Sequence, residues 1–265
     1  MKDLTGKTAL LTGASSGIGP YIARELRGEG VELVLSARRR ELLEELAREL
    51  GGAQVVPADL TRRRDVDNLL ERAGDIDILV ANAGLPASGK LVKLDPDDID
   101  RAIEVNLRVP ITMVRRVLPG MIERGEGHIV LMSSMAGKFA APNASVYNAT
   151  KFGLRGFGLA LRPELAKTGV GVSTIFPTFV KDAGMWAETG LKAPALAGEV
   201  SPEQVARAVV KAIKEDKIEV DVAPWPAKIG SKFVGAMPEL VVSVAERVQA
   251  TDLGEKAREA VKGKL

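Results

Sequence analysis

Apolar runs typical of β-strands alternate with helix-like segments along most of this 265-residue chain. The first run is KTALLT at residues 7–12, and the next is VELVLSA at residues 31–37. Each is followed by a segment whose apolar residues recur at helical spacing. This alternation predicts an α/β fold, a doubly wound parallel sheet with helices on both faces. Five further runs bring the expected strands to about seven: residues 53–58, 77–81, 128–134, 170–176 and 218–223.

The composition fits one large domain that folds without metal or disulfides. With 46% hydrophobic residues a sizeable core is possible, and we treat residues 1–265 as a single domain. Cysteine is absent and the N-terminus lacks the features of a signal peptide, so we expect a cytoplasmic protein. No apolar run is long enough for a transmembrane segment. A net charge of +2 argues against nucleic acid as a partner. The one histidine, His128, has no second His or Cys with which to form a metal site, so we expect it to have a structural role.

A glycine-rich turn, GASSGIG, joins the first predicted strand to the first predicted helix. Glycine lets a backbone approach a pyrophosphate closely, and the free N–H groups of a helix N-terminus attract the anion. We therefore predict a dinucleotide site here, although a plain tight loop would show the same glycines. The candidate residues are Gly13, Ser15, Ser16, Gly17, Ile18 and Gly19.

The end of the second predicted strand indicates which dinucleotide is preferred. Dinucleotide folds place an acidic residue there for a ribose 2′-hydroxyl, or an arginine for a 2′-phosphate. This chain has Ser36, Ala37, Arg38 and Arg39 and no carboxylate. We predict a preference for NADPH over NADH, with Arg38 as the main phosphate ligand and Arg39 as a helper. The alternative is that both arginines only flank the helix start.

Ser134, Tyr147 and Lys151 form a candidate catalytic group. Tyr147 and Lys151 are four residues apart at the start of a predicted helix and so share one face. Ser134 ends the fifth strand, and Gly137 and Pro142 allow the chain to turn back towards it. An ammonium about 4 Å away can lower the pKa of a phenol by roughly two units. The alternative is a chance pair, with the tyrosine half-buried and the lysine in solvent.

A long helix predicted from Asp95 contains Pro110, which has no N–H to give to the carbonyl of Asn106. That carbonyl is predicted to be free and could hold a water between this helix and Lys151. The alternative is a simple helix bend.

Residues 178–201 are rich in apolar side chains, Gly and Pro. A long irregular loop after a strand end is typical of a lid and suggests a partly hydrophobic small-molecule substrate, although it could simply plug against the domain. Residues 225–265 read as a C-terminal extension of two or three short helices. This extension could pack on the lid, form an oligomer contact or lie on a membrane surface.

Taken together, these motifs resemble the short-chain dehydrogenases and reductases. The resemblance rests on TGASSGIG, the turn Asn82-Ala83-Gly84, Asn106, Ser134 and the Tyr147-x-x-x-Lys151 pair, in this order over about residues 7–180. It implies a single-domain Rossmann-type fold, a nicotinamide cofactor and a homodimer or homotetramer. It also implies cofactor contacts by the glycine-rich turn and by Arg38, Asp59, Leu60, Asn82, Ala83, Gly84, Tyr147, Lys151, Pro177 and Val180.

The same resemblance implies a role for each catalytic candidate. Tyr147 would protonate the carbonyl oxygen, Ser134 would hold that oxygen, and Asn106 would hold a relay water. Lys151 would hold the nicotinamide ribose and lower the Tyr147 pKa. The chain departs from the family pattern at Thr178 and Asp182, where Gly and Thr are usual.

The expected function is an NADPH-dependent oxidoreductase that transfers hydride to a carbonyl or from a secondary alcohol. Two alternatives stay open at this point. One is a non-catalytic NADP(H)-binding regulatory protein, and the other is an epimerase or dehydratase on the same fold.

Overall fold

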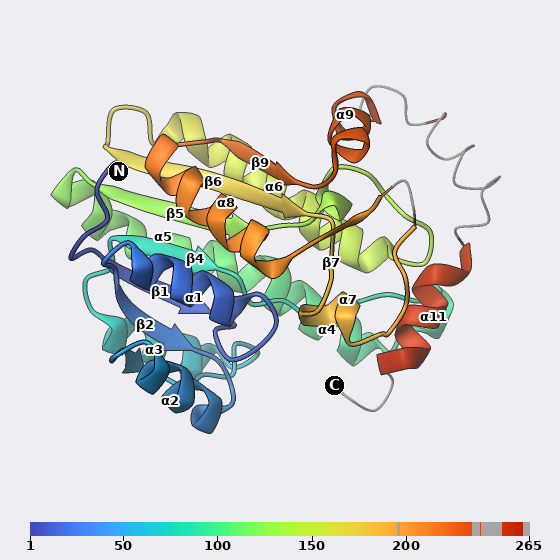
Figure 1. Ribbon diagram of the computed structural model, residues 1–265, viewed down its shortest axis with the longest axis horizontal. Helices are drawn as coiled ribbons and strands as arrows, with labels where there is room; N and C mark the ends of the chain where they lie inside the picture. The colour runs from blue at the N-terminus through green and yellow to red at the C-terminus, as the bar shows by residue number, and fades with distance from the viewer. Residues whose placement is uncertain (195–196, 235–238, 240–250, 262–265) are drawn as a thin grey trace.

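A seven-stranded parallel sheet forms the centre of the molecule (Figure 1). The computed structural model describes residues 1–194, 197–234, 239 and 251–261. The predicted α/β sheet is confirmed, although its third strand is much shorter than expected. The strands, in the order β3-β2-β1-β4-β5-β6-β9, are Gln54–Val55, Glu32–Ser36, Thr8–Thr12, Ile78–Ala81, Gly127–Met132, Val170–Pro177 and Glu219–Val222.

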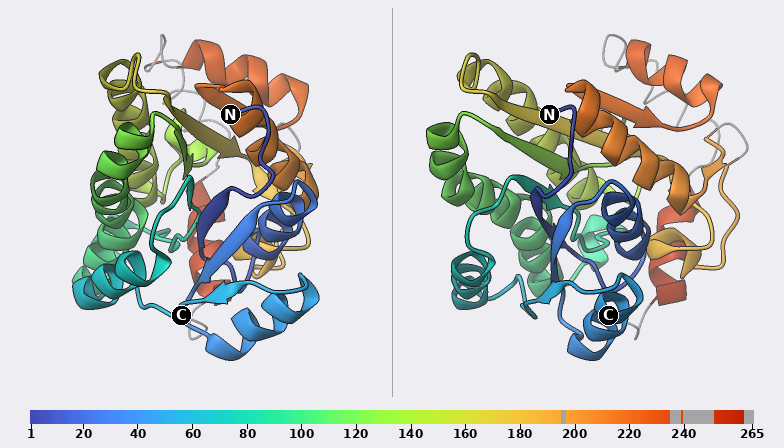
Figure 2. Two further views of the ribbon diagram at one scale, coloured as in Figure 1. Left: turned by 90° about the vertical axis from the view of Figure 1, so that its left-hand side faces the viewer. Right: turned by 60° about the vertical axis from the view of Figure 1, so that its left-hand side comes forward.

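Helices cover both faces of this sheet, as predicted (Figure 2). On one face, α1 (Gly19–Gly28), α2 (Arg40–Glu49) and α8 (Pro202–Glu215) bury their apolar sides. On the other face lie α3 (Arg63–Ala73), α5 (Val109–Arg124) and α6 (Ser145–Glu164). Because both faces are covered, the strands are almost continuously apolar, and every residue of β5 is buried.

The strand order reverses beside β1. Leu10 of β1 pairs with Val34 of β2 on one side and with Leu79 of β4 on the other. The connections after β1 and β4 therefore leave in opposite directions, which opens a crevice at the carboxyl ends of the two strands. The glycine-rich turn and residues 82–84 directly follow these two strands and therefore lie at this edge of the sheet.

The helix that precedes β5 widens just before Pro110. α4 (Pro96–Ile103) continues into a π-helical turn, η2 (Glu104–Arg108), and then into α5. In this turn the N–H of Val109 donates to the carbonyl of Glu104, five residues back. The predicted interruption of the long helix is thus confirmed, and π-turns of this kind mark functional sites in many proteins. The free carbonyl and the water at Asn106 stay predictions.

Residues 178–201 are more ordered than the sequence suggested. They contain β7 (Phe179–Val180), α7 (Gly184–Ala187) and β8 (Glu199–Val200), and β7 and β8 form a second, two-stranded parallel sheet. The expectation of an irregular loop was therefore wrong. The strands are too short to be recognised from periodicity alone.

The tail contains α9 (Trp225–Val234) and α11 (Thr251–Val261), seen in orange-red and red in Figure 1. The other helix predicted for the tail falls on residues 235–250, nearly all outside the described part of the chain. Two short 3₁₀-helices complete the fold, η1 (Leu91–Lys93) and η3 (Met135–Gly137). Among the described residues, no helix combines the length and the apolar character that crossing a membrane requires.

Candidate active site

The glycine-rich turn leaves β1 and enters α1 with a backbone that only glycine suits. Gly13 and Gly17 have φ angles of +67° and +59°. A β-carbon on Gly19 would lie 2.1 Å from the carbonyl oxygen of Gly13, so none can be accommodated. The turn is also anchored to β2, because the N–H of Ala14 donates to the carbonyl of Ser36 at 3.1 Å. The main chain is thereby held open for an anionic ligand at the start of α1.

The turn after β4 is bonded directly to the glycine-rich turn. The side-chain amide of Asn82 donates to the carbonyls of Thr12 at 3.1 Å and Gly13 at 3.3 Å. In return, the Thr12 hydroxyl accepts from the N–H groups of Asn82 and Ala83. Asn82 therefore positions the floor of the crevice. Sequence reasoning missed Thr12, a polar residue at the end of an apolar strand.

The end of β2 carries an unusual polar group. Ser36 is buried, and its hydroxyl has no hydrogen-bond partner among the described residues. Arg38, two residues further on, is exposed. A buried hydroxyl without a partner is costly unless a ligand completes it. Together with the glycine-rich turn, it fits the adenosine end of a bound dinucleotide.

Asp59 faces the same region after β3. Burial acts to raise the pKa of this carboxyl, but hydrogen bonds from Thr61 and the charges of Arg62 and Arg38 outweigh it, so the pKa lies below its usual range. The Arg38 charge is thus near enough to Asp59 to help lower its pKa. The Leu60 side chain, by contrast, belongs to the core at 9% exposure.

Ser134, Tyr147 and Lys151 meet at the carboxyl end of β5. The Lys151 ammonium, 3% exposed, donates to the carbonyl of Met132 at 3.0 Å and lies 5.5 Å from the centre of the Tyr147 ring. Ser134 opens η3, where its hydroxyl accepts from the N–H of Ala136 at 3.2 Å. A chance pair with the lysine in solvent is therefore excluded.

The pKa of Tyr147 does not follow the expected direction. Burial raises it to about 12, and a hydrogen bond with the Ser134 side chain lowers it only in part. Burial also lowers the pKa of Lys151 to about 8. The predicted net lowering of the Tyr147 pKa is therefore wrong, because burial outweighs the hydrogen bond from Ser134. Desolvation disfavours both charged forms, and sequence spacing carries no information about it.

Three neighbours hold the Ser134 loop in place, two of them against α6 and one against β9, and sequence reasoning missed all three. The Asn148 amide donates to the carbonyl of Ala136 at 2.6 Å and to that of Phe139 at 3.0 Å. The Ser133 hydroxyl donates to the Lys151 carbonyl at 3.0 Å. The buried ammonium of Lys138 pairs with two carboxylates of β9, Glu219 at 2.9 Å and Asp221 at 2.6 Å. Of these three residues only Asn148 could have been recognised from the sequence, because it directly follows Tyr147.

Asn106 lies in the π-turn and is completely buried. Its side-chain oxygen accepts from the N–H of Leu85 at 2.7 Å, and its amide donates to the carbonyl of Leu85 at 2.9 Å. A β-carbon on Gly84 would lie 3.4 Å from the Asn106 oxygen and 3.6 Å from the Lys151 nitrogen. The structure thus brings the side chains of Asn106 and Lys151 together on the same side of Gly84.

The segment after β6 lies over the glycine-rich turn. The Pro177 carbonyl accepts from the Ser134 hydroxyl at 3.4 Å, and the Val180 side chain is buried in the core. Thr178 bonds the main chain of Val222 and Ala197, and Asp182 adopts a φ of +64°. These two residues, which depart from the family pattern, therefore shape the base of the segment.

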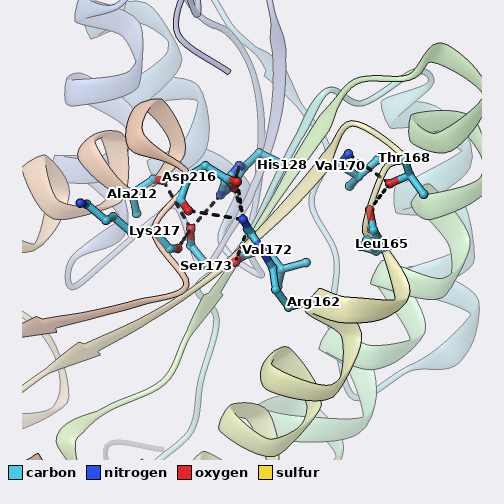
Figure 3. Close-up of polar contacts among 10 residues, drawn as sticks. All are labelled: His128, Arg162, Leu165, Thr168, Val170, Val172, Ser173, Ala212, Asp216 and Lys217. Carbon is cyan, nitrogen blue, oxygen red and sulfur yellow. Dashed lines mark hydrogen bonds and ion pairs between the residues drawn. The ribbon is translucent and has the colours of Figure 1, made fainter.

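No metal site is found in the part of the chain that the structure describes. His128 lies at the start of β5, at the opposite end of the strand from Ser134, and its ring nitrogen Nε2 is 2.8 Å from the Ser173 hydroxyl (Figure 3). The structural role predicted for His128 agrees with this position.

Several known proteins are similar to this chain. Ketoacyl reductase HetN of Nostoc sp. (strain PCC 7120 / SAG 25.82 / UTEX 2576) is 40% identical over 234 residues, which are 85% of this chain and 82% of HetN. An actinorhodin polyketide ketoreductase solved with NADPH superposes with a TM-score of 0.73 at 32% identity, covering 82% of this chain and 95% of that one. A 3-ketoacyl-(acyl-carrier-protein) reductase from Brucella melitensis, solved with NADH, has a TM-score of 0.77 at 28% identity and covers 84% of this chain and 99% of its own.

The model of the short chain dehydrogenase family matches residues 7–194. This match spans the glycine-rich turn, the turn at residues 82–84, and the group formed by Ser134, Tyr147 and Lys151. The chain therefore belongs to the short chain dehydrogenase family and is an oxidoreductase that uses a nicotinamide dinucleotide.

Proposed function

We propose that this enzyme reduces a ketone with NADPH and that Tyr147 is its general acid. The observation that supports this most is the convergence of Ser134, Tyr147 and Lys151 beside Gly84, at the carboxyl ends of the strands that flank the crevice. Parallel α/β sheets bind their ligands at this edge. The glycine-rich turn, Arg38 and Lys151 are the groups that would hold the dinucleotide.

A reduced nicotinamide held by the glycine-rich turn, Arg38 and Lys151 would supply the hydride that the carbonyl carbon receives. As the oxygen gains charge, the Ser134 hydroxyl donates a hydrogen bond to it and the Tyr147 phenol gives up its proton to it. With a pKa of about 12, the phenol holds that proton throughout the neutral range. The Lys151 ammonium, 5.5 Å from the ring centre, is a positive charge that favours the phenolate as it forms. Asn106 is proposed to hold the water that returns a proton to this group.

The preference for NADPH over NADH is supported by the exposed Arg38 at the end of β2, beside Asp59. A guanidinium binds a phosphate through charge-assisted hydrogen bonds. Solved relatives are divided, since the polyketide ketoreductase was solved with NADPH and the Brucella melitensis reductase with NADH. The arginine is therefore the feature to test.

A 3-ketoacyl group is the proposed substrate class, because HetN and both solved reductases are named for ketoacyl or ketide substrates. The segment 178–201 is proposed to act as a lid with a partly hydrophobic lining. Within it, the rings of Phe179 and Trp186 pack with centres 4.4 Å apart. Such an aromatic pair suits an acyl chain better than a charged substrate.

Assembly as a homodimer or homotetramer is also proposed. α5 and α6 expose large apolar side chains, Ile122 at 42%, Phe152 at 40% and Leu159 at 44%. Two helices of one sheet face that expose such side chains are typical of a surface covered by another subunit. Sedimentation velocity of the purified protein tests this, because a monomer at micromolar concentration would contradict it.

The main test follows NADPH absorbance with a panel of ketones that includes a 3-ketoacyl thioester. Tyr147→Phe is expected to abolish turnover and to leave NADPH binding within about twofold, because the phenol acts on the substrate oxygen. The chain has two tyrosines, so Tyr21→Phe on α1 is a matched control and should retain full activity. Turnover by Tyr147→Phe at the parental rate would refute the assignment.

A further inference from the structure

The C-terminal helix α11 docks on two loops at the rim of the candidate active site. The Arg258 guanidinium donates to the carbonyl of Lys93 at 2.6 Å. One turn earlier on the same face, Gly254 lies against Asn143, where a β-carbon would come within 2.7 Å of both the Asn143 β-carbon and its carbonyl oxygen. The Arg258 side chain also covers Gly89, whose β-carbon position is 2.6 Å from the Arg258 Cδ.

The two loops under α11 are joined to each other and to Tyr147. The N–H of Gly89 donates to the carbonyl of Asn143 at 2.6 Å, so both docking points belong to one bonded unit. Ala87, from the first loop, forms a buried cluster with Val146, and Leu94 and Tyr147 pack against it. One layer of packed side chains therefore separates the loops under α11 from Tyr147.

Gly254 allows α11 to approach the main chain of Asn143 closely. Glycine inside a helix costs about 1 kcal/mol relative to alanine. Here that cost is offset by contact with the Asn143 main chain, which no other residue could reach so closely. The tail carries a matched glycine: Gly230, in α9, would meet no atom within 4 Å if it gained a β-carbon.

We propose that α11 is a clamp that holds the substrate entrance in shape, with Gly254 and Arg258 as positioning residues. The clamp fixes the rim loop of residues 85–94 and the turn at Asn143, which together flank Tyr147. The clamp influences binding of the ketone substrate. The dinucleotide site lies on the β1–β2 side of the sheet and is expected to be unaffected. Its kinetic consequence rests on the proposed function, whereas its structural consequence does not.

Hydrogen–deuterium exchange of the full chain tests the structural part. In Gly254→Ala, amide exchange is expected to rise together in residues 251–261 and 85–94, because an undocked helix releases the loop. In Gly230→Ala, exchange in both segments should match that of the parent protein. Faster exchange in α11 with unchanged residues 85–94, or no change in either segment, would overturn the clamp.

Kinetics with the best ketone test the positioning part. Gly254→Ala and Arg258→Ala are each expected to raise the ketone KM about tenfold. Arg258→Ala removes the charge-assisted hydrogen bond to Lys93, and the methyl group added by Gly254→Ala clashes with Asn143 and displaces the helix that makes this bond. The NADPH KM should stay within twofold. The double variant should be no worse than either single one, because both changes release the same contact. Equal rises in the KM values for ketone and NADPH would overturn the proposal. If the parent protein reduces no ketone, the proposed function fails, and the exchange result still decides the clamp.

Discussion

Gly17 of the glycine-rich turn lies directly against Gly184 of α7, so that a β-carbon on Gly17 would be 3.1 Å from the Gly184 α-carbon. The segment 178–201 therefore rests on the turn that is proposed to hold the pyrophosphate. Both residues have positive φ angles, +59° and +82°, which favour glycine for backbone reasons as well. Dinucleotide binding and the position of this segment are expected to be coupled through this contact.

Gly17→Ala is expected to weaken dinucleotide binding about tenfold, because the new methyl group pushes the segment and the turn apart. The measurement is an NADPH fluorescence titration. Gly51→Ala is the matched control, since Gly51 has a φ of +73° but no atom within 4 Å of its β-carbon position. Both variants should lose about 1–2 kcal/mol of unfolding free energy from backbone strain. Equal NADPH affinities in the two variants would show that the Gly17–Gly184 contact has no part in binding.

Arg38→Ala should raise the NADPH KM by about 10- to 100-fold, as expected for the loss of hydrogen bonds from a charged group to a phosphate. The NADH KM should change little, because NADH lacks the 2′-phosphate. Steady-state kinetics with both dinucleotides measure the ratio. Arg40→Ala provides the control, since Arg40 already pairs with Glu44 on α2 at 3.4 Å. A parallel change for NADH and NADPH would contradict the assignment of Arg38.

Ketone reduction is expected to slow as the pH rises through about 8. Burial lowers the pKa of Lys151 to about 8, so this group is mainly an ammonium at pH 7 and mainly neutral at pH 9. Tyr147, with a pKa of about 12, keeps its proton over that whole range. The loss of rate should therefore report the lysine. The measurement is kcat/KM between pH 6 and 10.

Lys151→Arg keeps its charge at every pH in that range. Its residual activity is expected to be lower than that of the parent but flat from pH 7 to 10. A parent profile that stays level to pH 10 would show that the charge of Lys151 does not limit the reaction.

The fold was largely predictable because strand-type runs and helical periods are local signals. All seven strands of the main sheet lie within the predicted runs or next to them, and Pro110 correctly marked the break before α5. β7 and β8 escaped prediction because two-residue strands have no period, and their pairing depends on residues about twenty positions apart.

The candidate site was predictable where a residue type carries its own chemistry, as Tyr147 and Lys151 do. Supporting groups such as Thr12 and Asn148 were missed because their importance comes from partners distant in the fold. The direction of the Tyr147 pKa was missed for the same reason, since burial is a property of the packed molecule. The docking of α11 could not be predicted, because the sequence does not show that Gly254 contacts the distant Asn143.

His128 is expected to make the protein less stable in mild acid. The side chain is 1% exposed, and burial lowers its pKa to about 3 although Asp216 acts to raise it (Figure 3). The unfolded chain binds this proton near pH 6.5, whereas the folded chain does not, so stability is full above pH 6.5 and falls as the pH decreases towards 3. Between pH 7.5 and 5 the loss amounts to about 2 kcal/mol of unfolding free energy, measured by urea denaturation.

His128→Gln removes the titrating ring and keeps an amide that can bond the Ser173 hydroxyl, now 2.8 Å from Nε2. Its unfolding free energy should be nearly independent of pH over this range. Asp216 does not interfere, because its hydrogen bond with Arg162 is the largest effect on the carboxyl and holds its pKa below the usual range. Parallel pH curves for the variant and the parent would mean that the folded protein accommodates a charged imidazole at this position. In that case the acid sensitivity of the fold would have to come from the carboxylates, which titrate at lower pH.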